Sequence, residues 1–239
     1  MLSAAAGALM LFAVQPLRRR VDAARERSLR LHWRVFGSFD NLRRPLATLV
    51  MMPGMRRMGI AGGCLGAGQS AWFAFLVTYL VSQLGWSLEA AGVLFALMQL
   101  TSALGRPLAG FVSDRLGDGV RVLRWIAGCS ALTTLAFAFC TPDWPGWAVA
   151  ALAVLAGLTV ASWNGIQFAE VARMAPRGAL NEAMAGATLV LLGAYVLAPA
   201  LFSLVLAADG GFRLAFVMTA ALTALAMWPL AGCGRTEGP

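Results

Sequence analysis

The feature that most constrains this chain is a series of apolar runs, each of about 20 residues, the length that crosses a lipid bilayer as a helix. Only a helix or a closed barrel satisfies its backbone polar groups where water is absent, and these runs are too long and continuous for barrel strands. The sequence is 59% apolar and 13% charged, whereas a soluble domain carries about a quarter charged residues. We therefore expect an all-α membrane protein with six spans, at 58–83, 88–111, 122–140, 146–170, 182–206 and 212–232.

The basic residues predict how these spans are oriented. All 19 are arginines, they gather beside span ends, and they give a net charge of +8. If the basic segment before the first span is cytoplasmic, six spans return the end of the chain to the cytoplasm. Arg213 alone then lies at an outer end, and Arg106 lies within the second span near its inner end. The charge thus follows the positive-inside rule, and we expect no nucleic-acid partner.

The chain divides into four segments. Residues 1–17 look like the end of a transmembrane helix, 18–57 form a basic cytoplasmic linker, 58–232 hold the six-helix bundle, and 233–239 form a cytoplasmic tail. The linker mixes arginines with large apolar residues, which fits either an amphipathic helix on the anionic inner leaflet or a solvated connector. Because the first segment is short for a span, we expect the chain to begin part-way through a longer gene product, or its start to be misassigned.

Groups that carry covalent or metal chemistry are sparse in this sequence. Cys64, Cys129, Cys140 and Cys233 are scattered without a CxxC pair, and the one histidine is His32. No depth of the bundle gathers the His, Asp, Cys or Ser cluster that a membrane-embedded enzyme needs. We therefore expect no catalytic residue, no metal site, no disulfide framework and no cofactor.

A short charged segment, GRPLAGFVSDRLGDGVRVLR at 105–124, interrupts the apolar sequence between the second and third runs. Its core is Gly110-x-x-x-Asp114-Arg115-x-Gly117. We expect the glycines to allow a tight turn at the end of a membrane helix, with the charged pair where water meets lipid. The segment is either a functional loop or a set of interfacial anchors that fix the topology.

The spacing of these four residues resembles the signature loop of the major facilitator superfamily. The sequence departs from that loop at Asp118 and Gly119, where two basic residues usually follow, and Arg121 and Arg124 lie further along. The stretch WNGIQFAEVARMAP at 163–176 resembles the tenth helix of many bacterial members. The whole chain therefore looks like the carboxy-terminal half of such a transporter, with the end of helix six, the central linker and helices seven to twelve.

This resemblance implies secondary active transport of a small organic solute by alternating access, in which two six-helix halves rock about a site near the midplane. It implies that Asp114 closes the inward face by meeting a helix N-terminus of the other half, where partial positive charge suits a carboxylate. Arg115 would pair with an acid on a neighbouring helix of its own half. Glu170 is the candidate acid, with Arg173 one turn further on.

Polar side chains within the apolar runs are the candidates for contact with the solute, because such groups in lipid usually face a cavity or a partner helix. Hydrogen bonding between helices is the alternative for each of them. The candidates are Gln69, Gln99, Trp163, Asn164, Gln167 and Tyr195. We expect no acid, arginine or histidine near the middle of a full span. A proton-coupled mechanism would then need its titrating carboxylate in the other half.

These expectations also name partners and a location. The partners are the lipid bilayer, a small-molecule substrate and an amino-terminal six-helix half from the same gene or a separate chain, unless two copies of this half dimerise. The location is the bacterial inner membrane, with several spans and a cytoplasmic C-terminus. A second interpretation is a non-transporting scaffold or sensor that keeps the fold and uses the basic linker as its interaction surface.

Overall fold

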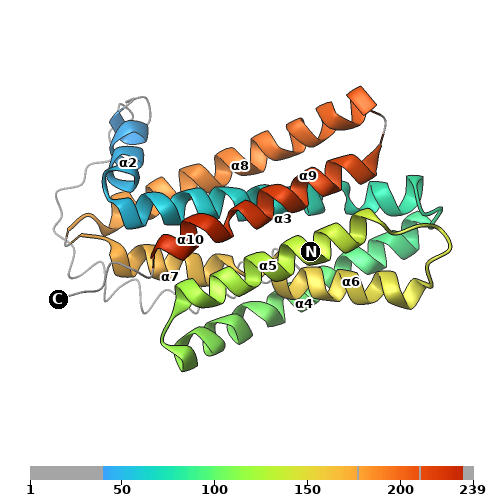
Figure 1. Ribbon diagram of the computed structural model, residues 1–239, viewed down its shortest axis with the longest axis horizontal. Coiled ribbons are helices and arrows are strands. Elements are labelled where there is room, and N and C mark those ends of the chain that lie inside the picture. Colours follow the sequence, from blue (N-terminus) through green and yellow to red (C-terminus); the bar gives the residue numbers. More distant parts are fainter. Residues whose placement is uncertain (1–39, 177, 210, 234–239) are drawn as a thin grey trace, which may run out of the picture. The chain divides into compact units, whose positions relative to one another are not determined.

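The computed structural model describes residues 40–176, 178–209 and 211–233 (Figure 1). Contacts group residues 42–239 into one unit and residues 1–41 into another. The expected helix end at 1–17, most of the expected basic linker and all but the first residue of the expected tail lie outside the described residues.

Six stretches of the described chain are long and apolar enough to cross a membrane, which confirms the expected all-α membrane fold. The protein is therefore a multi-pass membrane protein. A shorter helix, α2 (Asp40–Met51), precedes the six spans. The spans are α3 (Pro53–Ser82), α4 (Leu88–Leu116), α5 (Gly119–Ala138), α6 with α7 (Gly146–Thr159 and Asn164–Met174), α8 (Leu180–Asp209) and α9 with α10 (Phe212–Leu225 and Met227–Cys233).

Local sequence signals explain where α4 and α5 begin and end. Ser87 caps α4, since its hydroxyl oxygen accepts a hydrogen bond from a first-turn backbone N–H at 3.1 Å. At the other end, Gly117 has a φ of +64°, a left-handed conformation that suits glycine at a helix C-terminus. Asp118 then caps α5 by accepting a hydrogen bond from the Arg121 backbone N–H at 2.9 Å. The turn is therefore short, and Gly110 lies inside α4 rather than at the turn.

Several helices extend beyond the expected spans. Helix α3 begins at Pro53, inside the expected linker, because proline is tolerated in the first turn of a helix. Helix α4 continues to Leu116 instead of ending at 111, and α5 begins at Gly119. Helix α8 begins at Leu180, two residues before the expected span at 182–206, and continues to Asp209.

The fourth and sixth spans are each interrupted, which the sequence expectation missed. Between α6 and α7 the Ala161 carbonyl accepts a hydrogen bond from the Ser102 hydroxyl at 2.9 Å. The Val160 carbonyl accepts one from the Trp163 indole N–H, also at 2.9 Å. These bonds satisfy backbone groups that would otherwise be unpaired at membrane depth. The sixth span breaks at Ala226, between α9 and α10.

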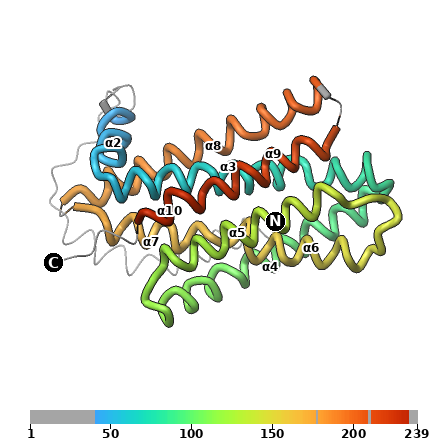
Figure 2. The backbone as a smooth tube through the Cα atoms, viewed as in Figure 1, coloured from blue at the N-terminus to red at the C-terminus, as the bar shows by residue number. Residues whose placement is uncertain are grey.

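Helix α3 is the most enclosed span. It lies beside α8 and also contacts α9, α10 and α7 (Figure 2). In its most apolar stretch 61% of the residues are buried, against 28% in α4 and 17% in α8. Helices α4 and α8 therefore leave broad apolar faces uncovered within this unit, as spans do when they meet lipid or a second group of helices.

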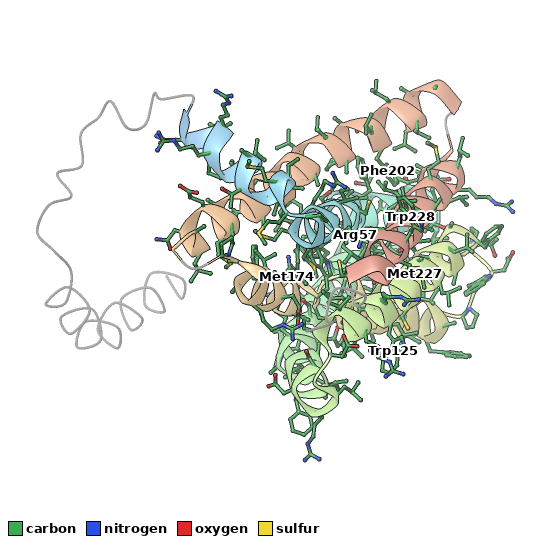
Figure 3. All side chains as sticks on the ribbon, turned by 60° about the vertical axis from the view of Figure 1, so that its left-hand side comes forward. Arg57, Trp125, Met174, Phe202, Met227 and Trp228 are labelled. Atoms are coloured by element: carbon green, nitrogen blue, oxygen red, sulfur yellow. The ribbon has the colours of Figure 1, made fainter. Side chains whose placement is uncertain are left out.

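The interior contains two apolar clusters. We call the end of the bundle that carries the turn between α4 and α5 the inner end, and the opposite end the outer end. The cluster toward the outer end is aromatic, with Trp72, Tyr79, Phe137 and Phe216 linked by ring contacts. The cluster toward the inner end is mainly aliphatic and sulfur-containing. Large side chains on the outside, such as Trp228 at 80% exposed, project away from both clusters (Figure 3).

Helix α2 is held against the inner part of α8 by close packing. A Cβ on Gly186 would overlap the backbone carbonyl of Pro45, so only glycine allows this approach. The Thr48 hydroxyl donates a hydrogen bond to Glu182 at 3.1 Å, and Leu49 is buried beside the contact. Pro45 lies within α2.

Candidate functional site

A polar pair joins two helices near the middle of the bundle. The Tyr195 hydroxyl on α8 donates a hydrogen bond to Gln69 Oε1 on α3 at 2.8 Å. Both residues lie near the midpoints of their helices, and Gln69 is only 2% exposed. A buried amide away from water needs such a partner, so this bond both links the helices and fixes the position of the tyrosine ring.

Asn164 lies beside this pair. Its side chain, at the start of α7, lies against the Tyr195 hydroxyl. Asn164 Oδ1 is buried and has no hydrogen-bond partner within the described ranges. Three helices thus bring polar groups together, and we call Gln69, Asn164 and Tyr195 the central polar cluster.

Gln167 occupies a packing position rather than an open one. It is 1% exposed, and its side chain lies across Gly62 of α3, where a Cβ would overlap it. Its Nε2 donates a long hydrogen bond of 3.5 Å to the Met58 carbonyl, and its Oε1 has no partner among the residues that the structure describes. In this half the side chain therefore contacts a neighbouring helix.

The remaining two candidates from the sequence lie apart from the central polar cluster. Trp163 is fully buried in the inner apolar cluster, with its indole N–H bonded to the backbone, so its ring does not reach the surface of this half. Gln99 is exposed on α4, two helical turns from Arg106 on the same side of the helix.

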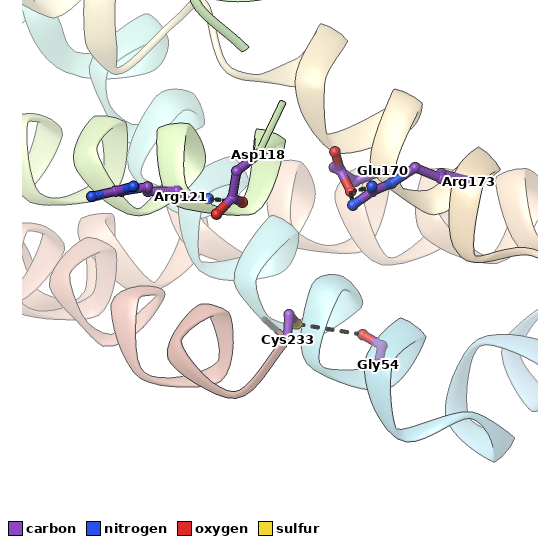
Figure 4. Close-up of polar contacts among 6 residues, drawn as sticks. All are labelled: Gly54, Asp118, Arg121, Glu170, Arg173 and Cys233. Atoms are coloured by element: carbon purple, nitrogen blue, oxygen red, sulfur yellow. Dashed lines mark hydrogen bonds and ion pairs between the residues drawn. The ribbon is translucent and has the colours of Figure 1, made fainter. Parts of the chain in front are cut away.

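The inner charged segment has a different geometry from the expected one. Asp114 and Arg115 are exposed in the last turn of α4, and the Arg115 guanidinium lies 4.9 Å from the centre of the Phe111 ring. Glu170 pairs with Arg173, with 2.7 Å between Oε2 and Nη2, instead of with Arg115 (Figure 4). An acid three residues before an arginine on one helix forms this pair locally, which the sequence interpretation overlooked.

The Glu170 carboxylate also touches the start of α5. Residue Glu170 is 7% exposed, and its Oε1 lies where a Cβ on Gly119 would be placed. The partial positive charge at the helix N-terminus suits a carboxylate at this position. Gly119, one of the two residues that depart from the superfamily loop, therefore makes room for the acid.

A cavity of about 490 Å³ lies near these inner ends, away from the central polar cluster. Its lining includes Pro53, Asp118, Arg173 and Cys233. Within the described ranges no three His, Cys, Asp or Glu side chains gather as metal ligands would. Cys140 lies in the outer loop after α5, where burial raises the pKa of its thiol to about 11.

Arg106 lies within α4, ten residues before the last residue of the helix, Leu116. The sequence analysis placed Arg106 near the inner end of a span that ends at 111, and the structure extends that helix by five residues.

Comparisons with known proteins agree with this architecture. A model of the Major Facilitator Superfamily matches residues 1–166 and 58–237. An uncharacterized MFS-type transporter of Mycobacterium tuberculosis is 30% identical over 119 residues, which cover 50% of this chain and 26% of that protein. A similarly described protein from another strain is 38% identical over 77 residues, which cover 32% of this chain and 17% of the relative.

A solved structure has the same fold. The crystal structure of the Escherichia coli fucose:proton symporter matches with a TM-score of 0.68 at 17% sequence identity. The match covers 84% of this chain and 47% of the symporter chain. The alignments with these relatives and this structure thus span less than half of each protein's length.

Proposed function

This chain belongs to the major facilitator superfamily, and from this premise we propose that it is the carboxy-terminal half of a secondary transporter. The transporter moves a small organic solute across the bacterial inner membrane by alternating access, with the inner loop and C-terminus in the cytoplasm. Its partner is an amino-terminal six-helix half, encoded in the same gene or separately. No step of this mechanism requires a covalent intermediate or a cofactor.

The observation that carries this proposal is the central polar cluster, which joins the enclosed helix α3 to the mostly uncovered helix α8. Polar groups at membrane depth face a cavity or a partner helix because lipid cannot bond them. Tyr195 and Gln69 partly satisfy each other, but Asn164 Oδ1 has no partner within the described part of the chain. Together with the low burial of α4 and α8, this arrangement favours a solute cavity shared with the other half.

Asp114 is the proposed contact that closes the inward face. Its exposed carboxylate lies in the last turn of α4, where the helix dipole disfavours negative charge. A helix N-terminus of the other half would offset this cost when the inward side closes. Arg115 lies beside it and remains available for the same interface, since Glu170 is already paired with Arg173.

The test is uptake of a panel of radiolabelled sugars, amino acids and carboxylates into vesicles that contain the intact protein. For the solute that is taken up, Asp114→Asn should reduce the rate about five- to thirty-fold, because losing one to two kcal/mol shifts a two-state equilibrium by that factor. The amount of inserted protein should stay the same. Asp143→Asn, in the outer loop, serves as the matched control and should leave uptake unchanged.

The outcomes separate the possible roles. Unchanged uptake by Asp114→Asn would exclude the closing contact while leaving transport in place. A correctly inserted protein that transports no member of the panel would favour the non-transporting scaffold or sensor instead.

A further inference from the structure

One side of α5 carries a row of residues that the other helices leave uncovered. Arg121, Arg124, Trp125 and Cys129 are exposed, and Gly128 between them is half-buried. Their spacing of three or four residues places them on one face of the helix. The opposite face of α5 is buried and packs on α9, α6 and α10. The row therefore meets whatever surrounds α5 in the membrane.

A groove of about 390 Å³ follows this row, between α5 and the start of α10. Arg121 and Arg124 line it where α5 begins, and Gly128 and Met227 line it further along. A Cβ on Gly128 would lie 3.5 Å from the end of the Met227 side chain, so the missing side chain leaves the hollow open. Met227 and Trp125 lie on the same side of the unit (Figure 3). The groove thus has a basic end and an apolar continuation.

The length of the groove matches one leaflet of a bilayer. Leu132 lines its far end and follows Arg121 by eleven residues, or about 16 Å along the helix. Half of the hydrocarbon thickness is about 15 Å. Helix α5 has 20 residues, or about 30 Å, so it is just long enough to cross the hydrocarbon and its first turns lie near the headgroups.

The basic end of the groove has no acidic partner within the described part of the chain. Asp118, the acid at the start of α5, accepts a hydrogen bond from the Arg121 backbone N–H at 2.9 Å and so acts as a helix cap. The Arg121 guanidinium lies 5.4 Å from the centre of the Trp125 ring. Neither Arg121 nor Arg124 forms an ion pair with a described residue. Two exposed cations beside an apolar groove favour an occupant with an anionic head and an apolar tail.

We propose that this groove binds one anionic phospholipid, with the phosphate on Arg121 and Arg124 and an acyl chain along Gly128, Leu132 and Met227. The guanidinium group presents several N–H donors in a fork that matches phosphate oxygens. Basic pockets beside transmembrane helices bind anionic lipid headgroups in the same way. The site concerns the lipid-facing side of α5 and is independent of the solute and of its transport.

A second copy of this chain is a poorer occupant of the groove. Most homodimers form by a two-fold contact in which both copies use the same surface. Such a contact through this face would bring the arginines of both copies together, and like charges repel. A phospholipid instead supplies the opposite charge.

The test compares two lipids that share their acyl chains and differ in headgroup charge. The full chain, purified in detergent and freed of lipid, is titrated with phosphatidylglycerol or phosphatidylcholine, and bound lipid is counted by native mass spectrometry. Phosphatidylglycerol should bind about thirtyfold more tightly, because each arginine near an anionic headgroup contributes about fivefold. Arg121→Gln combined with Arg124→Gln should remove this preference, and each single change should reduce it about fivefold.

Cys129 reports whether the lipid lies in the groove itself. It is exposed and lines the groove. In a variant that keeps Cys129 as its only cysteine, phosphatidylglycerol should slow the reaction of the thiol with N-ethylmaleimide. The same concentration of phosphatidylcholine should slow it less.

Two further variants keep the result interpretable. Arg121→Lys combined with Arg124→Lys retains both charges and should keep part of the preference, which guards against a glutamine variant that fails to fold. Arg213→Gln is the matched control. Its guanidinium also lies over an aromatic ring, 4.2 Å from the centre of Phe139, but it does not line this groove, so the variant should bind like the wild type.

Four results would overturn the assignment. Equal affinity for the two lipids, or a preference that survives the double glutamine substitution, would exclude the arginines as the headgroup site. Unchanged labelling of Cys129 with bound phosphatidylglycerol would place the lipid elsewhere. Displacement of the lipid by inorganic phosphate or glycerophosphoglycerol at an equal concentration would indicate a site for a soluble anion. A disulfide between Cys129 of two copies in vesicles, formed with copper phenanthroline, would make a second copy the occupant.

Discussion

Replacing Tyr195 with phenylalanine is the most direct perturbation of the central polar cluster. The change removes one oxygen atom and the 2.8 Å hydrogen bond to Gln69 Oε1, and it keeps the ring. Gln69 is 2% exposed, so no bulk water can replace the lost donor. The cost of the variant is therefore the free energy of leaving a buried amide oxygen unsatisfied.

The magnitude follows from two reference values. An unsatisfied buried acceptor costs about 1–3 kcal/mol in soluble proteins. Hydrogen bonds between membrane helices contribute less on average, about 0.6 kcal/mol with a maximum near 1.7, because the unfolded chain in lipid also finds partners. Since Gln69 is almost fully enclosed, we expect Tyr195→Phe to reduce the free energy of unfolding by about 1 kcal/mol.

The assay is unfolding of the purified chain by SDS in mixed micelles, followed by tryptophan fluorescence. Gln69→Leu combined with Tyr195→Phe should be less destabilising than the sum of the single changes, because replacing both partners leaves no unpaired group. Thr188→Val on the same helix is the control. Its hydroxyl bonds to the Met184 carbonyl at an exposed position, so its loss should change stability by less than about 0.5 kcal/mol.

Two results would refute this reasoning. If Tyr195→Phe were as stable as the wild type, Gln69 would have another donor or reach water. If the two single changes were strictly additive, the two side chains would not be coupled, and the central polar cluster would lose the contact that defines it.

Two other predictions concern the inner and outer ends. Gly119→Ala should destabilise the chain by about 1–3 kcal/mol in the same assay, because the new Cβ displaces the Glu170 carboxylate. Gly128→Ala on the same helix meets only Met227 at an ordinary 3.5 Å, so equal loss in both variants would contradict the Glu170 contact. In a variant that keeps Cys140 as its only cysteine, the thiol should react slowly with maleimide at pH 8 and faster as the pH approaches 11, because burial raises its pKa to about 11 and the thiolate is the reactive form. Burial therefore favours the protonated thiol, and its contribution to stability is present below the unfolded pKa of 9.0 and declines as the pH rises toward 11. Rapid labelling at pH 8 would show that the thiol is not buried in the membrane-bound protein.

Local sequence was sufficient for the number and approximate position of the spans. Each span is a property of a continuous apolar run, and the bilayer requires that such a run form a helix. Caps are local in the same way, since Ser87 bonds to a backbone N–H only three residues further on. The ends of α4 were harder to place, because a helix can continue beyond the apolar run into the interface, as it does through Asp114 and Arg115.

The pairing of polar side chains depended on tertiary structure. Tyr195 and Gln69 are 126 residues apart, and no local pattern indicates which polar groups of six helices meet at one depth. The broken fourth span places Asn164 beside them, although the apolar run through the break is continuous. Glu170 turned to Arg173 on its own helix because that partner is three residues away.

The sequence by itself therefore determined that this chain crosses a membrane six times as helices and favoured the orientation with most arginines on the inner side. Both follow from the free energy of transferring single segments from water to lipid. That free energy depends on the sequence of each segment and not on the other segments. Only the tertiary structure decided which buried polar groups satisfy one another, as Tyr195 and Gln69 do. Those relations arise from contacts between distant helices, whose packing depends on side-chain shapes across the whole bundle.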